Sequence, residues 1–219
     1  MLPPSAEIPV ADRVADAALL VIDMQNDFVR QGAPLEVPEA RDTIAPIRRL
    51  LAAFRDRRRP VVYTRFLATQ EPSLMWLWSP QCGVDTKCCW DGVDRAYADA
   101  AGKLDCTAVI DELSPLPGEP VIDKYGYGSF HATGLDALLR GLGVRSLVVT
   151  GTVAQICVEE TAREAFHHGY RTVMVSDGVS SFDQELKAGT LRNFAMKFGW
   201  VADAATVLDW LGATPQTRA

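Results

Sequence analysis

AALLVID, at residues 17–23, is the stretch that decides the fold class of this chain. Its apolar residues form a short run without polar alternation, and the run ends in an aspartate. Such a run is typical of a strand with two buried faces, as in parallel sheets that helices cover on both sides. We therefore predict that residues 17–23 form the buried first strand of such a sheet.

Predicted helices and strands alternate along the rest of the chain. Residues 39–58 have apolar side chains at helical spacing, and arginines occupy the opposite face. Further helices are expected at 135–142, 155–169 and 184–197. Further strands are expected at 60–66, 119–126, 144–151, 170–178 and 199–204. This alternation is typical of the α/β class, in which a mainly parallel sheet lies between two layers of helices.

The stretch 67–118 interrupts this regular pattern. It contains Trp76, Trp78 and Trp90 among scattered prolines and glycines. We interpret it as a long excursion over the sheet, and long ordered loops of this kind are often functional. The length of 219 residues suits one domain with a single buried core, so we predict a single domain over residues 1–219.

The charge and hydropathy of the chain argue against several classes of partner. A net charge of −6 argues against nucleic acid, because phosphate binding needs a basic face. No apolar run approaches the roughly 18 residues that a membrane span requires, so no membrane partner is expected. Prolines and acidic residues precede the first arginine, which is not the pattern of a signal peptide.

The cysteines indicate the compartment and argue against a metal site. They are Cys82, Cys88, Cys89, Cys106 and Cys157. An odd number of cysteines without a secretory signal fits free thiols in a reducing cytoplasm. The spacing of Cys82, Cys88 and Cys89 matches no zinc motif, and no histidine lies near them. We therefore expect a cytoplasmic protein without a metal or another cofactor.

Three residues of catalytic type follow predicted strands. Asp23 ends the first strand, Lys124 lies at the end of a later one, and Cys157 follows the strand at 144–151. Ligands of open parallel sheets bind outside the carboxyl ends of the strands, so these three side chains should meet at one edge. A thiol nucleophile needs a base and a cation, which Asp23 and Lys124 would supply.

Each of these residues also has an ordinary structural interpretation. A lone cysteine is most often a small buried hydrophobic residue, an aspartate at a strand end is often a turn residue, and a lysine is usually solvated. Cys157 differs because it lies in the first turn of a predicted helix. There the helix dipole and free backbone N–H groups are expected to lower the pKa of the thiol. The residues alone leave both interpretations open.

Three blocks carry a resemblance to a known family: LLVIDMQNDF (19–28), VIDKYGYGSF (121–130) and VTGTVAQICVEETAREAF (149–166). Their sequence and order resemble the signature blocks of the isochorismatase-like cysteine hydrolases. The resemblance extends from about residue 17 to about residue 211. It implies a three-layer α/β/α fold whose six-stranded, mainly parallel sheet has the Rossmann-like order 3-2-1-4-5-6.

The resemblance also assigns roles in catalysis. Asp23 matches the catalytic aspartate of the family, Lys124 matches the lysine after the third strand, and Cys157 matches the nucleophile. A cis peptide bond is implied between Thr152 and Val153. It would direct the N–H groups of Val153 and Cys157 toward the oxyanion of the reaction.

Four further residues are candidates for substrate contact. Phe28 matches an aromatic residue that lines the substrate pocket in the family. Arg65 would hold a substrate carboxylate or pair with an acidic neighbour, and Tyr125 would line the pocket or pack beneath a turn. Gln155 stands where the family often has Asn or Asp, and it would tune the pocket or cap the helix.

Departures from the family narrow the chemistry. TRFLATQEP (64–72) lacks the Asp-x-His pair with which nicotinamidases hold a metal, so neither nicotinamide nor a metal is expected. Isochorismatases cleave a vinyl ether without a cysteine nucleophile, so Cys157 favours amide or ureide hydrolysis. IDKYGYGSF (122–130) and GWV (199–201) resemble the branch that hydrolyses biuret, triuret or ureidoacrylate. In biuret hydrolases a glutamine of the last helix contacts the substrate. AMKFG (195–199) lacks this glutamine, which argues against biuret itself as the substrate.

Together, residues and resemblance predict a cysteine-dependent amidohydrolase that cleaves a C–N bond of a small amide, ureido or carbamoyl compound. An acyl-thioester would form on Cys157, and ammonia or an amine would leave. The alternatives are a vinyl-ether hydrolase of the isochorismatase type and a non-catalytic binding protein on the same fold. The resemblance also implies a homodimer or homotetramer, in which the excursion at 67–118 completes its own or a neighbouring site.

Overall fold

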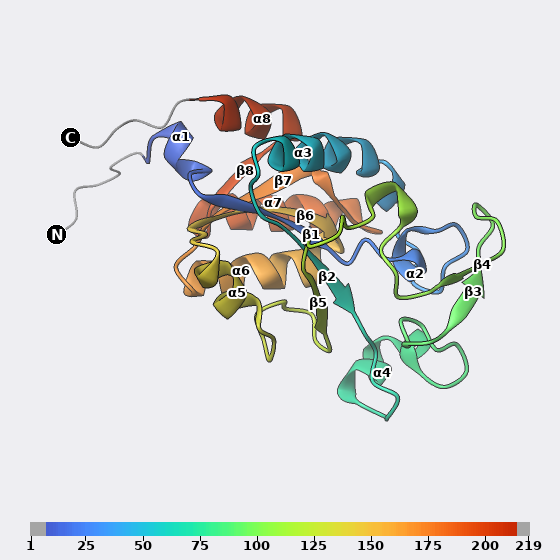
Figure 1. The fold of residues 1–219 in the computed structure, drawn as a ribbon. Helices are drawn as coiled ribbons and strands as arrows, with labels where there is room; N and C mark the ends of the chain where they lie inside the picture. The colour runs from blue at the N-terminus through green and yellow to red at the C-terminus, as the bar shows by residue number, and fades with distance from the viewer. Residues whose placement is uncertain (1–7, 214–219) are drawn as a thin grey trace.

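The described part of the chain, residues 8–213 of a computed structural model, forms a six-stranded sheet between two layers of helices (Figure 1). Its strands are β1 (Ala17–Ile22), β2 (Val61–Phe66), β5 (Val121–Lys124), β6 (Ser146–Thr152), β7 (Arg171–Ser180) and β8 (Trp200–Ala202). The strand order is β5-β2-β1-β6-β7-β8, and every neighbouring pair runs parallel. Counted in chain order, that is 3-2-1-4-5-6, so the predicted fold class is confirmed.

β1 lies inside the sheet and is buried along its whole length. Successive side chains of a strand point to opposite faces of the sheet. Leu19 and Val21 accordingly pack into one hydrophobic core, whereas Leu20 and Ile22 pack into the other. The uninterrupted apolar run of this strand therefore follows from burial on both faces.

Two groups of helices cover the two faces of the sheet. The short helix α2 (Asn26–Val29) follows β1, and the other α-helices outside segment 67–118 are α1 (Val10–Arg13), α3 (Ile44–Asp56), α5 (Leu135–Gly141), α6 (Glu159–His167), α7 (Gln184–Lys197) and α8 (Ala204–Gly212). α3 and α8 pack on one face, and α5, α6 and α7 pack on the other (Figure 1). No helix within residues 8–213 has the length and apolar character needed to cross a membrane.

The order of the strands creates a crevice at the carboxyl ends of β1 and β6, where the chain crosses to opposite sides of the sheet. Gly151 allows the two strands to come close together there. Its φ is +118°, and a Cβ at this position would overlap the carbonyl oxygen of Ile22. Only glycine tolerates both conditions. The residue after Ile22 is Asp23, so this approach positions the predicted base.

The segment 67–118 lies beyond the carboxyl end of β2 (Figure 1). Its elements are α4 (Leu74–Trp78), the 3-10 turn η2 (Pro80–Cys82), the hairpin strands β3 (Asp94–Ala96) and β4 (Lys103–Asp105), and the 3-10 turn η3 (Asp111–Leu113). We call this segment the excursion. The ends of the predicted domain, residues 1–7 and 214–219, lie outside the described residues.

The start of the helix that carries Cys157 differs from the prediction. Residues Ala154–Val158 form a π-helical turn, η4, and α6 begins only at Glu159. The wider turn is closed by a hydrogen bond of 3.2 Å from the N–H of Val158 to the carbonyl of Val153. Turns of this kind are rare and occur frequently at functional sites.

Candidate active site

Asp23 and Lys124 form a buried ion pair at the carboxyl edge of the sheet. Asp23 follows β1 and Lys124 ends β5, and β2 lies between these two strands. The Nζ atom of Lys124 lies 2.7 Å from Oδ2 of Asp23, and both side chains have an exposed fraction of 0%. Two side chains that the sequence places 101 positions apart, 124 minus 23, thus meet as the strand-end argument predicts.

The ammonium group of Lys124 is held by the loop that follows it. It donates hydrogen bonds of 3.0 Å to the carbonyls of Gly126 and Tyr127. Burial works to lower the pKa of Lys124, but the negative charge of Asp23 and the contact with Cys157 outweigh it and raise this pKa. The lysine therefore stays charged, and it is fixed in place by acceptors on three sides.

Two residues that sequence reasoning missed support the site at Asp23: Thr64 binds its carboxylate, and Gln25 ties the chain after Asp23 to β2. The hydroxyl of Thr64 donates to Oδ1 of Asp23 at 2.7 Å. The side chain of Gln25 bridges to β2, because it donates to the carbonyl of Phe66 at 2.9 Å and accepts from its N–H at 2.7 Å. Thr64 is paired with Ile22 in the sheet, so strand register was the signal that would have revealed it.

Cys157 lies in η4 with only 4% of its surface exposed, and it contacts both members of the ion pair. Burial, the largest effect, and the charge of Asp23 raise the pKa of the Cys157 thiol to about 12, although Lys124 works to lower it. The expectation of a lowered pKa is therefore wrong for the resting site, because burial outweighs the helix terminus. A neutral thiol needs a base before it can attack, and Asp23 is in contact with it.

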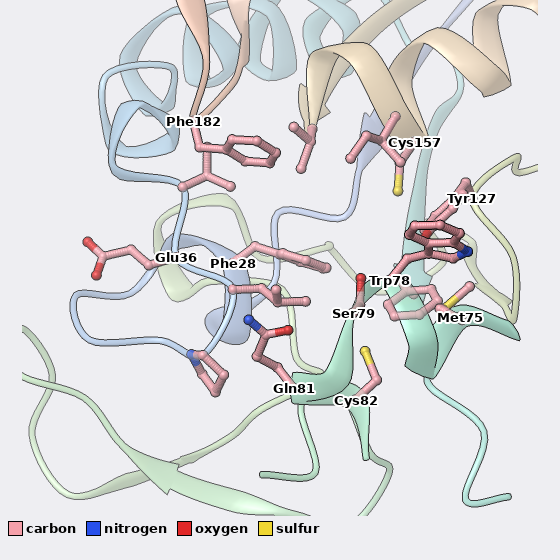
Figure 2. A pocket seen from close by; sticks show the side chains of 16 residues that line it. Phe28, Glu36, Met75, Trp78, Ser79, Gln81, Cys82, Tyr127, Cys157 and Phe182 are labelled. Carbon is pink, nitrogen blue, oxygen red and sulfur yellow. The ribbon is translucent and has the colours of Figure 1, made fainter. Parts of the chain in front are cut away.

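A pocket of about 440 Å³ opens in front of Cys157, whose sulfur points into it (Figure 2). The excursion supplies one wall of the pocket, with Met75, Trp78, Ser79, Gln81 and Cys82. Other walls of the pocket are formed by residues of the chain after β1, of η4 and of the loop after Lys124. The excursion thus lines the site of its own chain.

The predicted backbone features lie at the same place. The peptide bond between Thr152 and Val153 is cis. Val153 and Cys157 both line the pocket. We expect their N–H groups to hold the oxyanion of the reaction.

The four predicted substrate contacts are placed differently from one another. Phe28 lines the pocket and packs against Phe66, with ring centroids 6.4 Å apart. Arg65 and Tyr125 line a separate hollow, and Arg65 pairs with Asp123 at 2.8 and 3.0 Å, so the ion-pair interpretation of Arg65 holds. Gln155 lines another surface hollow, beside α7. These three are not brought to the pocket of Cys157.

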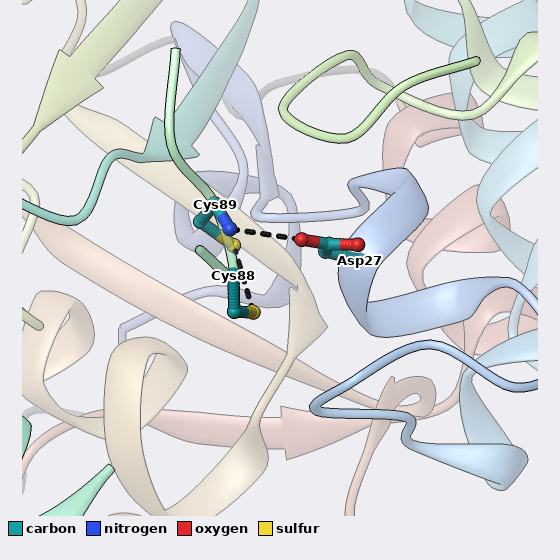
Figure 3. A group of neighbouring side chains, drawn as sticks. All are labelled: Asp27, Cys88 and Cys89. Carbon is teal, nitrogen blue, oxygen red and sulfur yellow. Dashed lines mark hydrogen bonds between the residues drawn. The ribbon is translucent and has the colours of Figure 1, made fainter. Parts of the chain in front are cut away.

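A second buried group joins Asp27 to Cys88 and Cys89 in the excursion (Figure 3). The two sulfur atoms are 3.7 Å apart. The carboxylate of Asp27 accepts hydrogen bonds from the N–H of Cys89 at 2.8 Å, from Arg95 at 2.8 Å and from the hydroxyl of Tyr97 at 2.7 Å. Three donors satisfy this carboxylate, which we interpret as the anchor of the excursion. Sequence reasoning missed it.

Replacing Asp27 by asparagine is expected to lower the free energy of unfolding by about 2–4 kcal/mol, because it leaves Arg95 without its buried partner. Urea unfolding of the variant measures this loss. Asp123→Asn is the matched control, since it removes a half-exposed pair with Arg65 and should cost less than about 1 kcal/mol. Equal losses in the two variants would contradict the anchor role.

Comparisons with known proteins place the chain among hydrolases. Residues 17–206 match the family model of the isochorismatase domain. The chain is 30% identical to ureidoacrylate amidohydrolase RutB of Agrobacterium fabrum, over 97% of this chain and 96% of that protein. A cysteine hydrolase from Pseudomonas syringae pv. phaseolicola has a similar structure, with a TM-score of 0.81, 25% identity and coverage of 97% and 99%. N-carbamoylsarcosine amidase of Thermoplasma acidophilum aligns with a TM-score of 0.67, 30% identity and coverage of 86% and 96%.

Proposed function

This chain belongs to the isochorismatase family, and on that basis we propose that it hydrolyses a C–N bond of a small amide, ureido or carbamoyl compound through an acyl-thioester on Cys157. The observation that carries the proposal is the buried ion pair of Asp23 and Lys124 in contact with the thiol of Cys157 at a pocket wall. The names of two relatives, an amidohydrolase and an amidase, support the same class of reaction.

In the first half of the reaction, Asp23 accepts the proton of the Cys157 thiol while Lys124 compensates the charge on sulfur. The thiolate attacks the substrate carbonyl, and an S–C bond forms. The N–H groups of Val153 and Cys157 are proposed to hold the oxyanion, a contribution of about 3–4 kcal/mol for one such donor elsewhere. Asp23 then gives its proton to the nitrogen, the C–N bond breaks, and ammonia or an amine leaves.

In the second half, water enters the position that the leaving group vacated. Asp23 accepts a proton from this water, whose oxygen attacks the acyl-thioester carbonyl. The S–C bond breaks, the sulfur of Cys157 regains a proton from Asp23, and the acid product leaves. The raised pKa of Cys157 fits this cycle, because the thiol starts and ends neutral.

The test is to incubate the protein with primary amides and carbamoyl compounds in the presence of a chelator. Ammonia release is followed, and acid-quenched samples are examined by mass spectrometry for an acyl group on the Cys157 peptide. We expect release together with that adduct. Release of ammonia with no adduct on Cys157 at any time would contradict the thioester route, and turnover of a vinyl ether alone would favour the isochorismatase reaction.

The predicted location and assembly are part of the proposal. All five cysteines are unpaired, which supports a reducing compartment such as the cytoplasm. The exposed apolar side chains Leu74 and Leu77 on α4 support a homodimer or homotetramer, since exposed apolar patches often mark contacts between proteins. Sedimentation of the purified protein as a monomer at micromolar concentration would contradict the assembly.

A further inference from the structure

The pocket in front of Cys157 indicates which substrates it accepts. We propose that the substrate is an uncharged amide or carbamoyl compound with an apolar, aryl- or alkyl-sized substituent, and not a compound that carries a carboxylate. This inference rests on the proposed function and makes it more specific. It departs from two relatives whose names specify ureidoacrylate and N-carbamoylsarcosine, because both of those compounds carry a carboxylate.

The wall of the pocket is apolar on most sides. Its apolar side chains include Phe28, Leu35, Phe66, Met75, Ile156 and Phe182. Two aromatic side chains of the wall, Trp78 and Phe182, still expose 82% and 60% of their surface. A bound apolar substituent would cover part of this surface, and removing apolar surface from water favours binding.

The pocket offers no counter-charge to a carboxylate. Among the described residues that line it, none is arginine, lysine or histidine. The nearby Lys124 is fully buried, and Asp23 and two carbonyls already occupy its ammonium group. Proteins usually bind carboxylates with arginine, and an ion that enters an apolar site without a partner loses its hydration.

The charged side chain that does line the pocket has the wrong sign for an anionic substrate. The N–H of Gly32 and the guanidinium of Arg41 hold the carboxylate of Glu36 and lower its pKa, so it stays ionised. Arg41 is in turn occupied by Glu36 and by the carbonyl of Val29, both at 2.8 Å. Glu36 and Arg41 thus neutralise each other, and neither leaves a free positive charge for an anionic substrate.

The size of the pocket fits the same class of substrate. Its volume of about 440 Å³ lies within the roughly 300–1,000 Å³ typical of sites for drug-sized ligands. Ser79 and Gln81 add uncharged polar groups to the wall. Such groups can orient an amide or carbamoyl group by hydrogen bonds without requiring a charge on the substrate.

The experiment compares pairs of substrates in which one member carries a carboxylate and the other is uncharged. Ureidoacrylate is assayed beside its methyl ester, and 4-ureidobenzoate beside phenylurea, by ammonia release. We expect kcat/KM to be about 100-fold higher for the uncharged member of each pair, since the site leaves a carboxylate unpaired. An equal or higher kcat/KM for the acids would overturn the inference while leaving the proposed amidohydrolase function intact.

A second test adds a positive charge to the wall of the pocket. Gln81→Arg is expected to shift the preference toward ureidoacrylate by at least about tenfold relative to its ester. The matched control is Gln70→Arg, because Gln70 is exposed and does not line this pocket. An unchanged ratio in Gln81→Arg, or an equal shift in both variants, would overturn the inference.

Binding separates this inference from the proposed function. Calorimetry with the Cys157→Ser variant measures the affinity for each compound without turnover. Tighter binding of the uncharged compounds supports the inference even if the wild type forms no acyl-enzyme, a result that would contradict only the proposed reaction. Tighter binding of the acids overturns the inference whatever the chemistry proves to be.

Discussion

Replacing Cys157 by serine is expected to lower kcat/KM by about 10⁴-fold or more, because the loss of an enzyme's nucleophile lowers its rate by several orders of magnitude. A serine hydroxyl is far less acidic than a thiol, so the carboxylate of Asp23 removes its proton far less readily. Ammonia release from the best substrate of the wild type gives the measurement. Circular dichroism and urea unfolding show whether the variant keeps its fold.

Cys106→Ser is the matched control for this substitution. Cys106 is also fully buried and also has a raised pKa, of about 12, because of burial. It lies in the excursion, does not line the pocket, and lies 3.3 Å from the carbonyl of Trp90. We expect its kcat/KM to stay within about tenfold of the wild type. Activity that survives in Cys157→Ser would sink the nucleophile assignment and favour the vinyl-ether reaction.

The parallel sheet and the meeting of Asp23, Lys124 and Cys157 at one edge were predictable from buried apolar runs and strand ends, whereas the order of the strands was implied only by the resemblance to the isochorismatase-like family. β1 is apolar on both faces, which requires helices on both sides of the sheet. Asp23 and Lys124 end strands whose carboxyl ends meet at one edge, so their contact follows from topology alone. Cys157 follows β6, and the same argument brings it to that edge.

The environment of these side chains was less predictable, because segments that are distant in sequence create it. The direction of the pKa shift of Cys157 depends on how deeply the thiol is buried, and a helix-terminus argument does not contain that information. Arg65 lies next to the end of β2, but successive side chains of a strand point to opposite faces, so Phe66 lines the pocket whereas Arg65 pairs with Asp123 beside a separate hollow. Ser79 and Gln81 lie in and beside a single 3-10 turn, which is too short to give a sequence periodicity that predicts their place in the pocket.

The anchor of the excursion illustrates the same limit. Asp27 lies only four residues after Asp23, yet its carboxylate binds groups more than 60 positions away in the sequence, among them Cys89, Arg95 and Tyr97. Spacing in the sequence does not tell which of the two aspartates, Asp23 or Asp27, belongs to the candidate active site. Position at the edge of the sheet does so, because Asp23 meets Lys124 there, whereas Asp27 faces the excursion.

Replacing Asp23 by asparagine is expected to slow turnover and, at the same time, to make the thiol of Cys157 easier to ionise. Turnover should fall by about 10³–10⁴-fold, because asparagine cannot accept the thiol proton. The pKa of Cys157 should fall as well, since the charge of Asp23 works to raise it and that of Lys124 works to lower it. The thiolate then forms at a lower pH than in the wild type, where this pKa is about 12.

Alkylation of Cys157 by iodoacetamide separates the two effects. Its rate, read by mass spectrometry of the Cys157 peptide between about pH 7 and 10, should be higher in Asp23→Asn than in the wild type, because the thiolate is the nucleophile. Asp123→Asn removes a carboxylate that does not contact Cys157 and should leave both alkylation and turnover unchanged. A variant that turns over slowly and alkylates quickly would show that turnover is not lost for want of thiolate, which supports a proton-transfer role of Asp23 in the cycle. Slower alkylation in Asp23→Asn would contradict the predicted fall of the Cys157 pKa.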